Sequence, residues 1–111
     1  MPPLTSQPPS VAALPVVVKG TNSGKTKLFS LEAGDYSVVV KGKSTGQYGG
    51  NVMADLYDSS GNVVDFAMVN EIVNGRRSFT FSNNEYNLDG GQYYLDVTMP
   101  SGSWSITFSP Q

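Results

Sequence analysis

Two reactive residue types are missing from this 111-residue sequence, which contains neither cysteine nor histidine. Without cysteine the chain can form no disulfide, no thiolate zinc site and no cysteine nucleophile. Without histidine it lacks the commonest general base near neutral pH, and a Ser-His-Asp triad is impossible. Paired carboxylates, a lysine nucleophile or a carboxylate metal site remain, but no residue pattern singles out one of them. We therefore predict a protein that is not an enzyme and uses no cofactor.

Charged residues are few, and they are unevenly distributed along the chain. They make up 14% of the sequence and give a net charge of −2, so there is no basic footprint for nucleic acid. Residues 1–43 carry five lysines and two acids, a net charge of +3, whereas residues 44–111 carry two arginines and seven acids, a net charge of −5. This asymmetry is either chance or the sign of two oppositely charged surfaces that meet in a repeating assembly.

Long apolar runs are absent as well. No segment approaches the roughly 18 apolar residues of a membrane span. The opening MPPLTSQPPSVAALP also lacks the charged and apolar regions of a secretory signal. We therefore expect no membrane partner.

Proline is concentrated at the start of the sequence, where residues 1–15 hold five of the seven prolines. Such a stretch favours an extended polyproline conformation and cannot form a helix or a central strand. We predict an extended arm over residues 1–15 that lies against a protein partner, followed by one domain over residues 16–111. The arm residues expected to contact that partner are Pro2, Pro3, Leu4, Pro8, Pro9, Val11 and Leu14.

One short stretch, GTNSGKT over residues 20–26, is close to a phosphate-binding loop. That motif needs four residues between its glycines, and Gly20 and Gly24 have three between them. The residues that follow have strand composition, so no helix N-terminus would face a phosphate. We interpret the stretch as a hairpin turn.

The rest of the sequence alternates apolar and polar residues with the period of two that β-strands require. Strands are expected over residues 16–19, 27–31, 36–41, 51–57, 63–69, 76–81, 92–99 and 103–108. The side chains expected to face inward include Val52, Ala54, Leu56, Val64, Phe66, Met68, Phe79, Phe81, Tyr93, Leu95, Val97, Met99, Trp104, Ile106 and Phe108.

The turns complete the predicted architecture. Asn74-Gly75 lies between apolar runs and favours a type I′ hairpin, which needs positive φ at both residues. Longer loops are expected over residues 42–50 and 82–91. About eight short strands with turns between them and no helix candidate predict an all-β fold, an antiparallel β-sandwich of the jelly-roll or immunoglobulin-like type.

Three segments together resemble a known family. NVMADLYDSSGNVVD over residues 51–65, GGQYYLDVT over residues 90–98 and GSWSITF over residues 102–108 are similar to the bacterial pre-peptidase C-terminal domain, a small extracellular β-sandwich module. The resemblance spans about residues 27–108. It implies a sandwich that binds, tethers or assists secretion, in some members with calcium.

Acidic residues offer a possible calcium site. Asp55, Asp58 and Asp65 lie around one turn, with Asp96 on a strand that could be close, and calcium prefers several carboxylate oxygens. The segment DSSGN lacks the spacing of an EF-hand loop. Solvent-facing acids on the polar side of a sheet explain the same residues, so we assign no metal ligand.

Exposed aromatic and basic residues offer binding surfaces instead. Tyrosine rings stack on sugars and serve protein interfaces equally well. Two adjacent arginines after the predicted hairpin could clamp a carboxylate on a protein partner. The tyrosines in question are Tyr48, Tyr57, Tyr86 and Tyr94, and the arginines are Arg76 and Arg77.

These features predict a non-catalytic structural or interaction protein. Its most specific form is a virion component, such as a phage capsid decoration (cement) protein that anchors through its arm. The partners would then be a capsid or another repeating assembly, and further copies of the chain. The alternative is a secreted, extracellular module that binds carbohydrate or a cell surface.

Overall fold

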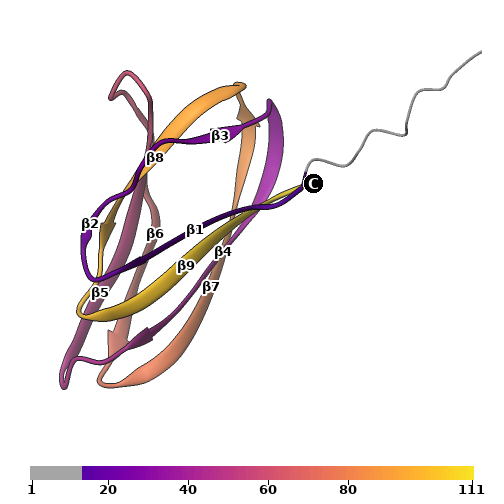
Figure 1. Cartoon of the computed structure of the whole chain (residues 1–111). Helices are drawn as coiled ribbons and strands as arrows, with labels where there is room; N and C mark the ends of the chain where they lie inside the picture. Colours follow the sequence, from indigo (N-terminus) through magenta and orange to yellow (C-terminus); the bar gives the residue numbers. More distant parts are fainter. Residues whose placement is uncertain (1–13) are drawn as a thin grey trace, which may run out of the picture.

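In the computed structural model, which describes residues 14–111, the chain folds into a sandwich of two antiparallel β-sheets (Figure 1). Residues 1–13 lie outside the described part, and with them the partner-binding candidates from Pro2 to Val11. The described residues form no helix, so they include none that could cross a membrane. The strands are β1 (Val16–Thr21), β2 (Gly24–Lys25), β3 (Phe29–Leu31), β4 (Gly34–Ser44), β5 (Gly49–Asp58), β6 (Val63–Asn74), β7 (Arg77–Leu88), β8 (Gly91–Thr98) and β9 (Gly102–Pro110).

The strand order identifies the type of sandwich. Sheet A has the order β1-β9-β4-β7, and sheet B has the order β2-β8-β5-β6, with β3 pairing beside β2 on the same edge of β8. If β2 and β3 count as one interrupted edge strand, only the β5–β6 link stays within a sheet, and every other link crosses to the other sheet. An immunoglobulin-like sandwich keeps several consecutive strands in one sheet. The predicted antiparallel sandwich is confirmed, and its connections are those of a jelly roll.

Alternating apolar side chains from both sheets fill the space between them. Phe108 is completely buried, and its ring centroid lies 5.4 Å from that of Phe29 and 6.4 Å from that of Tyr36. Burial of each such side chain stabilises the fold by about 1.5–3 kcal/mol. The inward residues confirmed on β5, β8 and β9, and directly after β8, are Val52, Ala54, Leu56, Tyr93, Leu95, Val97, Met99, Trp104, Ile106 and Phe108.

Two turns predicted as hairpins join the two sheets instead. The stretch over residues 20–26 leads from β1 in sheet A to β2 in sheet B, and Asn74-Gly75 leads from β6 in sheet B to β7 in sheet A. Gly75 has a φ of +70°, but Asn74 is not in the positive-φ region, so the type I′ turn does not form. Both hairpin predictions are wrong, because turn residues mark where a chain reverses, whereas the partner of each strand is decided by the packing of whole sheets.

Two segments predicted as long loops are mostly strand. In the segment over residues 42–50, β4 continues to Ser44 and β5 begins at Gly49. In the segment over residues 82–91, β7 continues to Leu88. Both extensions continue the pairing between β4 and β7. The ladder of hydrogen bonds therefore prevails over the low strand propensity of glycine and asparagine.

The predicted inward face of β6 is wrong. Val69 pairs with inward-facing Ala54 and Asp65 pairs with inward-facing Leu56, so β6 has two more residues than β5 between these pairs, and Ala67 among them has a left-handed φ of +54°. Because side chains alternate along a strand, Phe66 lies on the face opposite to Asp65. Val64 and Phe66 are therefore exposed, contrary to expectation, and Asp65 faces the space between the sheets. Only Met68 of the predicted inward set on this strand is buried.

Candidate functional site

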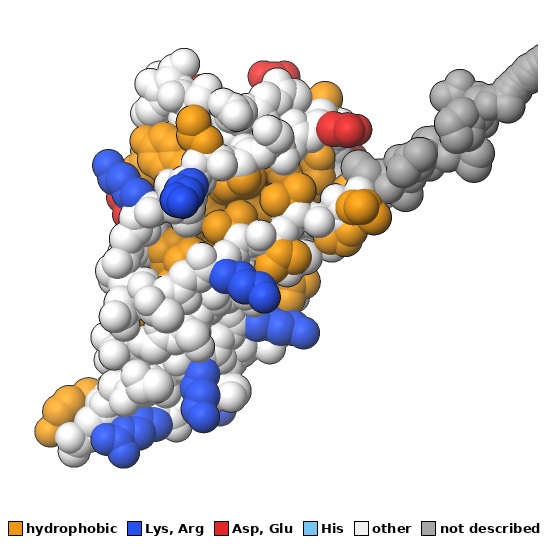
Figure 2. All heavy atoms as spheres, viewed as in Figure 1, with side chains coloured by type: hydrophobic (Ala, Val, Ile, Leu, Met, Phe, Trp, Pro, Cys, Tyr) orange, Lys and Arg blue, Asp and Glu red, His pale blue; other side chains and the backbone are white. Residues whose placement is uncertain are grey.

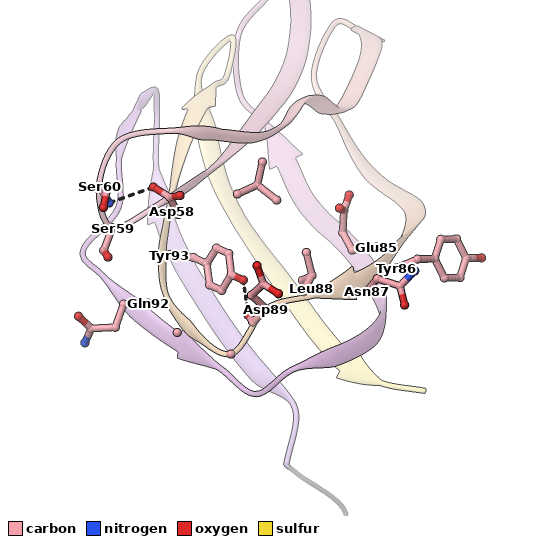
Figure 3. A pocket seen from close by; sticks show the side chains of 13 residues that line it. Asp58, Ser59, Ser60, Glu85, Tyr86, Asn87, Leu88, Asp89, Gln92 and Tyr93 are labelled. Atoms are coloured by element: carbon pink, nitrogen blue, oxygen red, sulfur yellow. Dashed lines mark hydrogen bonds between the residues drawn. The ribbon is translucent and has the colours of Figure 1, made fainter.

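A cavity of about 460 Å³ lies between the end of β7 and the turn that precedes β6 (Figure 3). Asp58 and Ser60 lie on one side of this cavity, and Glu85 and Asp89 lie on the other. The hydroxyl of Tyr93 donates a hydrogen bond to the backbone carbonyl of Asp89. The lining is therefore polar and acidic.

Glu85 is buried at the border of this cavity with only 7% of its surface exposed, and its Oε2 has no hydrogen-bond partner among the described residues. Burial raises the pKa of the Glu85 carboxyl to about 8, and a hydrogen bond to Asp65 and the charge of Asp65 add to this rise. Glu85 is therefore protonated at neutral pH and can donate to Asp65. We therefore expect one proton between Glu85 on β7 of sheet A and Asp65 on β6 of sheet B.

The sequence does not single out Glu85, because its polar neighbours predict a loop. The signal that could have found it is the inward pair Phe79 and Phe81, since a period of two continues to Asn83 and then to Glu85. The structure places Asn83 in a matching role, because its Nδ2 donates to the backbone carbonyl of Met68 in β6 at 2.6 Å. Two polar side chains of β7 therefore reach across to β6.

Two of the four aspartates considered for calcium, Asp55 and Asp58, accept hydrogen bonds from the backbone of the chain itself. Asp58 Oδ1 accepts hydrogen bonds from the backbone N–H groups of Asn62 and Ser60, both at 2.9 Å, and the Asn62 bond does most to lower the pKa of Asp58. Asp55 is buried rather than solvent-facing, and its Oδ1 accepts from the backbone N–H of Ala67 at 2.7 Å. In residues 14–111 no three acidic side chains gather in a way that could hold a metal ion.

Replacing Asp55 by alanine is expected to lower the free energy of unfolding by about 2 kcal/mol, because the N–H of Ala67 loses a charged acceptor. Asp96 lies directly opposite Asp55 on β8 and serves as the matched control. Asp96→Ala removes a like-charge repulsion with Asp55 and an opposite-charge pairing with Lys25 on β2, and because these two effects oppose each other it should change stability by less than about 0.5 kcal/mol. Urea denaturation measures both variants, and equal losses would contradict the role given to Asp55.

The structure brings two of the four candidate tyrosines together. The rings of Tyr57 on β5 and Tyr94 on β8 stack with centroids 5.1 Å apart and planes 10° apart, on the outer face of sheet B. Burial, followed by the charges of two nearby aspartates, raises the pKa of Tyr57. Tyr48 and Tyr86 are highly exposed but lie elsewhere, in the loop after β4 and on β7. The stacked pair is therefore the part of the molecule best suited to a sugar ring.

The remaining predicted contact residues lie in two separate places. Arg76 and Arg77 are exposed where β6 connects to β7. Leu14, the only arm candidate within the described residues, is exposed beside a hollow of about 520 Å³ that Leu31 and Tyr36 also line. The structure does not bring the arginines and Leu14 together, since β1 and β7 are opposite edges of sheet A.

The residues of the GTNSGKT stretch have structural roles. Gly20 packs against Trp104, and a Cβ at this position would lie 2.4 Å from the indole ring. Asn22 adopts a left-handed φ of +56°, donates its backbone N–H to the carbonyl of Gly102 at 2.7 Å, and accepts from the N–H of Gly102 at 3.1 Å. These contacts account for the glycine and the asparagine without a phosphate.

One side of the sandwich, which we name the lysine edge, consists of β1, β2 and β3. A hollow of about 420 Å³ separates β1 from β2 and β3. Its walls include Lys19, Lys25 and Lys27 together with exposed Val17 and Leu28. Figure 2 shows hydrophobic side chains at the floor of the hollow and basic side chains at its border.

Strand β6 forms the other edge of sheet B, which we name the acidic edge. It carries the exposed Glu71 and also Asp65, whose side chain faces the space between the sheets. It also exposes Val63, Phe66 and Ile72, of which Phe66 and Ile72 are 68% and 73% exposed. The two edges of sheet B therefore both combine apolar side chains with charge, and the charges are opposite in sign.

No family model and no curated protein matches this chain. The resemblance to the pre-peptidase C-terminal domain therefore stays a prediction, and the function has to be inferred from the surfaces described above.

Proposed function

We propose that this chain is a non-catalytic structural protein that binds other proteins through the edges of its sandwich and through its N-terminal arm. The observation that supports this most is the exposure of large apolar side chains on both edges of sheet B, with Leu28 50%, Phe66 68% and Ile72 73% exposed. Apolar side chains that gather at free strand edges are typical of interaction surfaces. In its most specific form the protein is a virion component, such as a phage capsid decoration protein.

The protonated Glu85 beside Asp65 has a structural role in this proposal. A general acid must come within about 2.6–3.2 Å of the atom that it protonates. Glu85 is only 7% exposed, and the carboxyl group next to it that adds to the rise of its pKa is Asp65 of the chain itself. The pair therefore serves to hold β7 against β6.

Removal of residues 1–14 tests the role of the arm. We expect the shortened chain to lose binding to its partner assembly while the sandwich keeps its stability, because the described core begins after this segment. Co-sedimentation of full and shortened chains with phage capsids measures the loss, and thermal unfolding provides the control. Undiminished co-sedimentation of the shortened chain would contradict the proposed anchor.

The stacked Tyr57 and Tyr94 favour a second candidate, a carbohydrate-binding module. The jelly-roll architecture occurs in both capsid and lectin domains, so the fold does not decide between them. In this alternative a glycan array should detect binding that Tyr94→Ala abolishes and that removal of residues 1–14 leaves unchanged. An array without any signal would contradict the alternative.

A further inference from the structure

We propose that copies of this chain associate head to tail, with the acidic edge of one copy bound to the lysine edge of the next. This inference rests on the proposed function and deepens it, because it names a second copy of the chain as one partner. The two surfaces lie at opposite ends of sheet B, where β2 and β3 form one edge and β6 forms the other. Association through them would therefore continue sheet B from copy to copy.

Free backbone groups are available at both edges. Within residues 14–111, strand β6 pairs only with β5, and β2 and β3 pair only with β8, so the outer side of each strand keeps N–H and C=O groups without a strand partner. On β6 the carbonyl of Met68 is an exception, because it accepts from the Asn83 side chain. Such edges form a template for strand addition. Backbone pairing alone would join any two of these edges, so charge has to select the combination.

The charges favour the mixed combination. Lys25 and Lys27 would meet the same lysines if two lysine edges paired, and Glu71 would meet the same glutamate if two acidic edges paired. Like charges at such positions repel, whereas the mixed combination places Glu71 opposite lysines. Each edge is thus protected against pairing with itself and is complementary to the other edge.

The apolar side chains are complementary as well. The lysine edge contains the hollow of about 420 Å³, lined in part by Val17, Leu28 and Phe29. The acidic edge presents Phe66 and Ile72, which project from β6 without cover from the described residues. Phe66 and Ile72 lie on the outer face of sheet B, so pairing of the two edges would bring them beside the exposed Leu28 of the next copy and remove these side chains from water.

Because the two surfaces differ, this contact does not close on itself in a symmetric pair. A heterologous contact of this kind forms a ring when its rotation closes and a filament when it does not. Either outcome suits a part of a repeating assembly. An isolated symmetric dimer does not fit the arrangement.

Charge reversal on either edge tests the inference by sedimentation velocity of the full chain at low ionic strength. We expect the unmodified chain to associate, and both Lys25→Glu/Lys27→Glu and Glu71→Lys to weaken the association by about tenfold or more. Lys41→Glu/Lys43→Glu is the matched control, because it changes the net charge as much as the first variant but lies on β4 in the middle of sheet A. This control should associate like the unmodified chain.

A mixture of the two charge-reversed variants provides the sharpest test. Each variant alone carries edges of one sign, whereas the mixture again offers opposite charges at every contact. We expect association to return in the mixture. Failure of the mixture to associate, or a loss in the Lys41→Glu/Lys43→Glu control equal to that of the edge variants, would overturn the inference.

The variant Phe66→Ser tests the apolar part of the contact, and it should weaken association by about tenfold. It should not lower the unfolding temperature, because Phe66 is exposed in the single copy. Unchanged association of this variant would contradict the apolar contact. Removal of residues 1–14 should leave edge-to-edge association intact. The shortened chain therefore tests the two proposals separately. Its binding to the partner assembly depends on the arm, and its association with other copies depends on the two edges.

Discussion

Replacing Glu85 by glutamine is expected to stabilise the protein at pH 8 by on the order of 3 kcal/mol and to remove most of a pH dependence that the unmodified protein shows. The amide of glutamine can donate to Asp65 without a titrating proton. It also places no charge in the buried position that Glu85 occupies. The stabilisation should therefore grow with pH.

The direction of this pH dependence follows from the pKa of Glu85, which lies at about 8 in the folded chain against an ordinary value of 4.5. Between these values the folded chain keeps the proton and the unfolded chain has lost it. The free energy of unfolding should therefore fall by about 1.4 kcal/mol for each pH unit over this range, and the contribution of the protonated pair is lost as the pH rises through 8. Below pH 4.5 both states are protonated, and the contribution is complete.

Urea denaturation of the unmodified protein and of Glu85→Gln between pH 4 and pH 9 measures this difference. Glu71→Gln is the matched control, because Glu71 is an exposed glutamate on the neighbouring strand β6. It should leave the pH dependence in place. If the unfolding free energy changed with pH equally in the unmodified protein and in Glu85→Gln, no shared proton would join β6 and β7.

Replacing Gly49 by alanine is expected to cost more than about 4 kcal/mol or to prevent folding. Gly49 has a φ of +72°, and a Cβ on it would lie 2.0 Å from the carbonyl oxygen of Val73 and 2.5 Å from the nitrogen of Gly75. Both are backbone atoms, so neither can move aside as a side chain could. The contact lies where β5 begins and β6 ends, next to the link that carries the chain into sheet A.

Gly46 provides the control for this substitution. A Cβ on Gly46 would come no closer than 3.7 Å to the Ser101 side chain, and its φ is not positive. Gly46→Ala should therefore change the free energy of unfolding by less than about 0.5 kcal/mol. Thermal and urea unfolding compare the two variants. A folded Gly49→Ala protein with the stability of Gly46→Ala would contradict the close approach of β5 to the end of β6.

Alternation alone predicts the core where a strand is regular. Trp104, Ile106 and Phe108 follow a period of two on β9 and are all buried, as expected. The prediction fails for Phe66, because β6 has apolar residues at odd and at even positions, and its pairing with β5 turns Asp65 rather than Phe66 inward. No local pattern in β6 carries that information.

Turn chemistry is similarly limited. Asn74-Gly75 reverses the chain as predicted, but β6 and β7 belong to different sheets. The choice between a hairpin and a link across the sandwich is made by long-range packing, which the two turn residues do not encode. Glu85 was missed for a related reason, since its burial depends on β7 extending beyond Phe81 along β4.

The candidate surfaces were predictable only in part. The uneven charge along the sequence is either chance or the sign of two surfaces of opposite sign. The structure places Lys19, Lys25 and Lys27 around one hollow and the exposed Glu71 on β6 at the other edge of sheet B, whereas Lys41 and Lys43 lie on β4 in sheet A. The sequence does not show that these edges also expose Leu28 and Phe66, because that depends on which strands end each sheet. The stack of Tyr57 on Tyr94 likewise requires the pairing of β5 with β8.

The central claim is that this protein works through surfaces that fit other protein surfaces, in the first place those of its own copies. Sedimentation equilibrium of the unmodified full chain at low and at high ionic strength tests it most directly, because the range over which exposed charges attract falls from about 30 Å at 0.01 M salt to about 3 Å at 1 M. We predict species heavier than the single chain at low ionic strength that dissociate as salt is added. A single chain at every concentration and ionic strength would contradict the account.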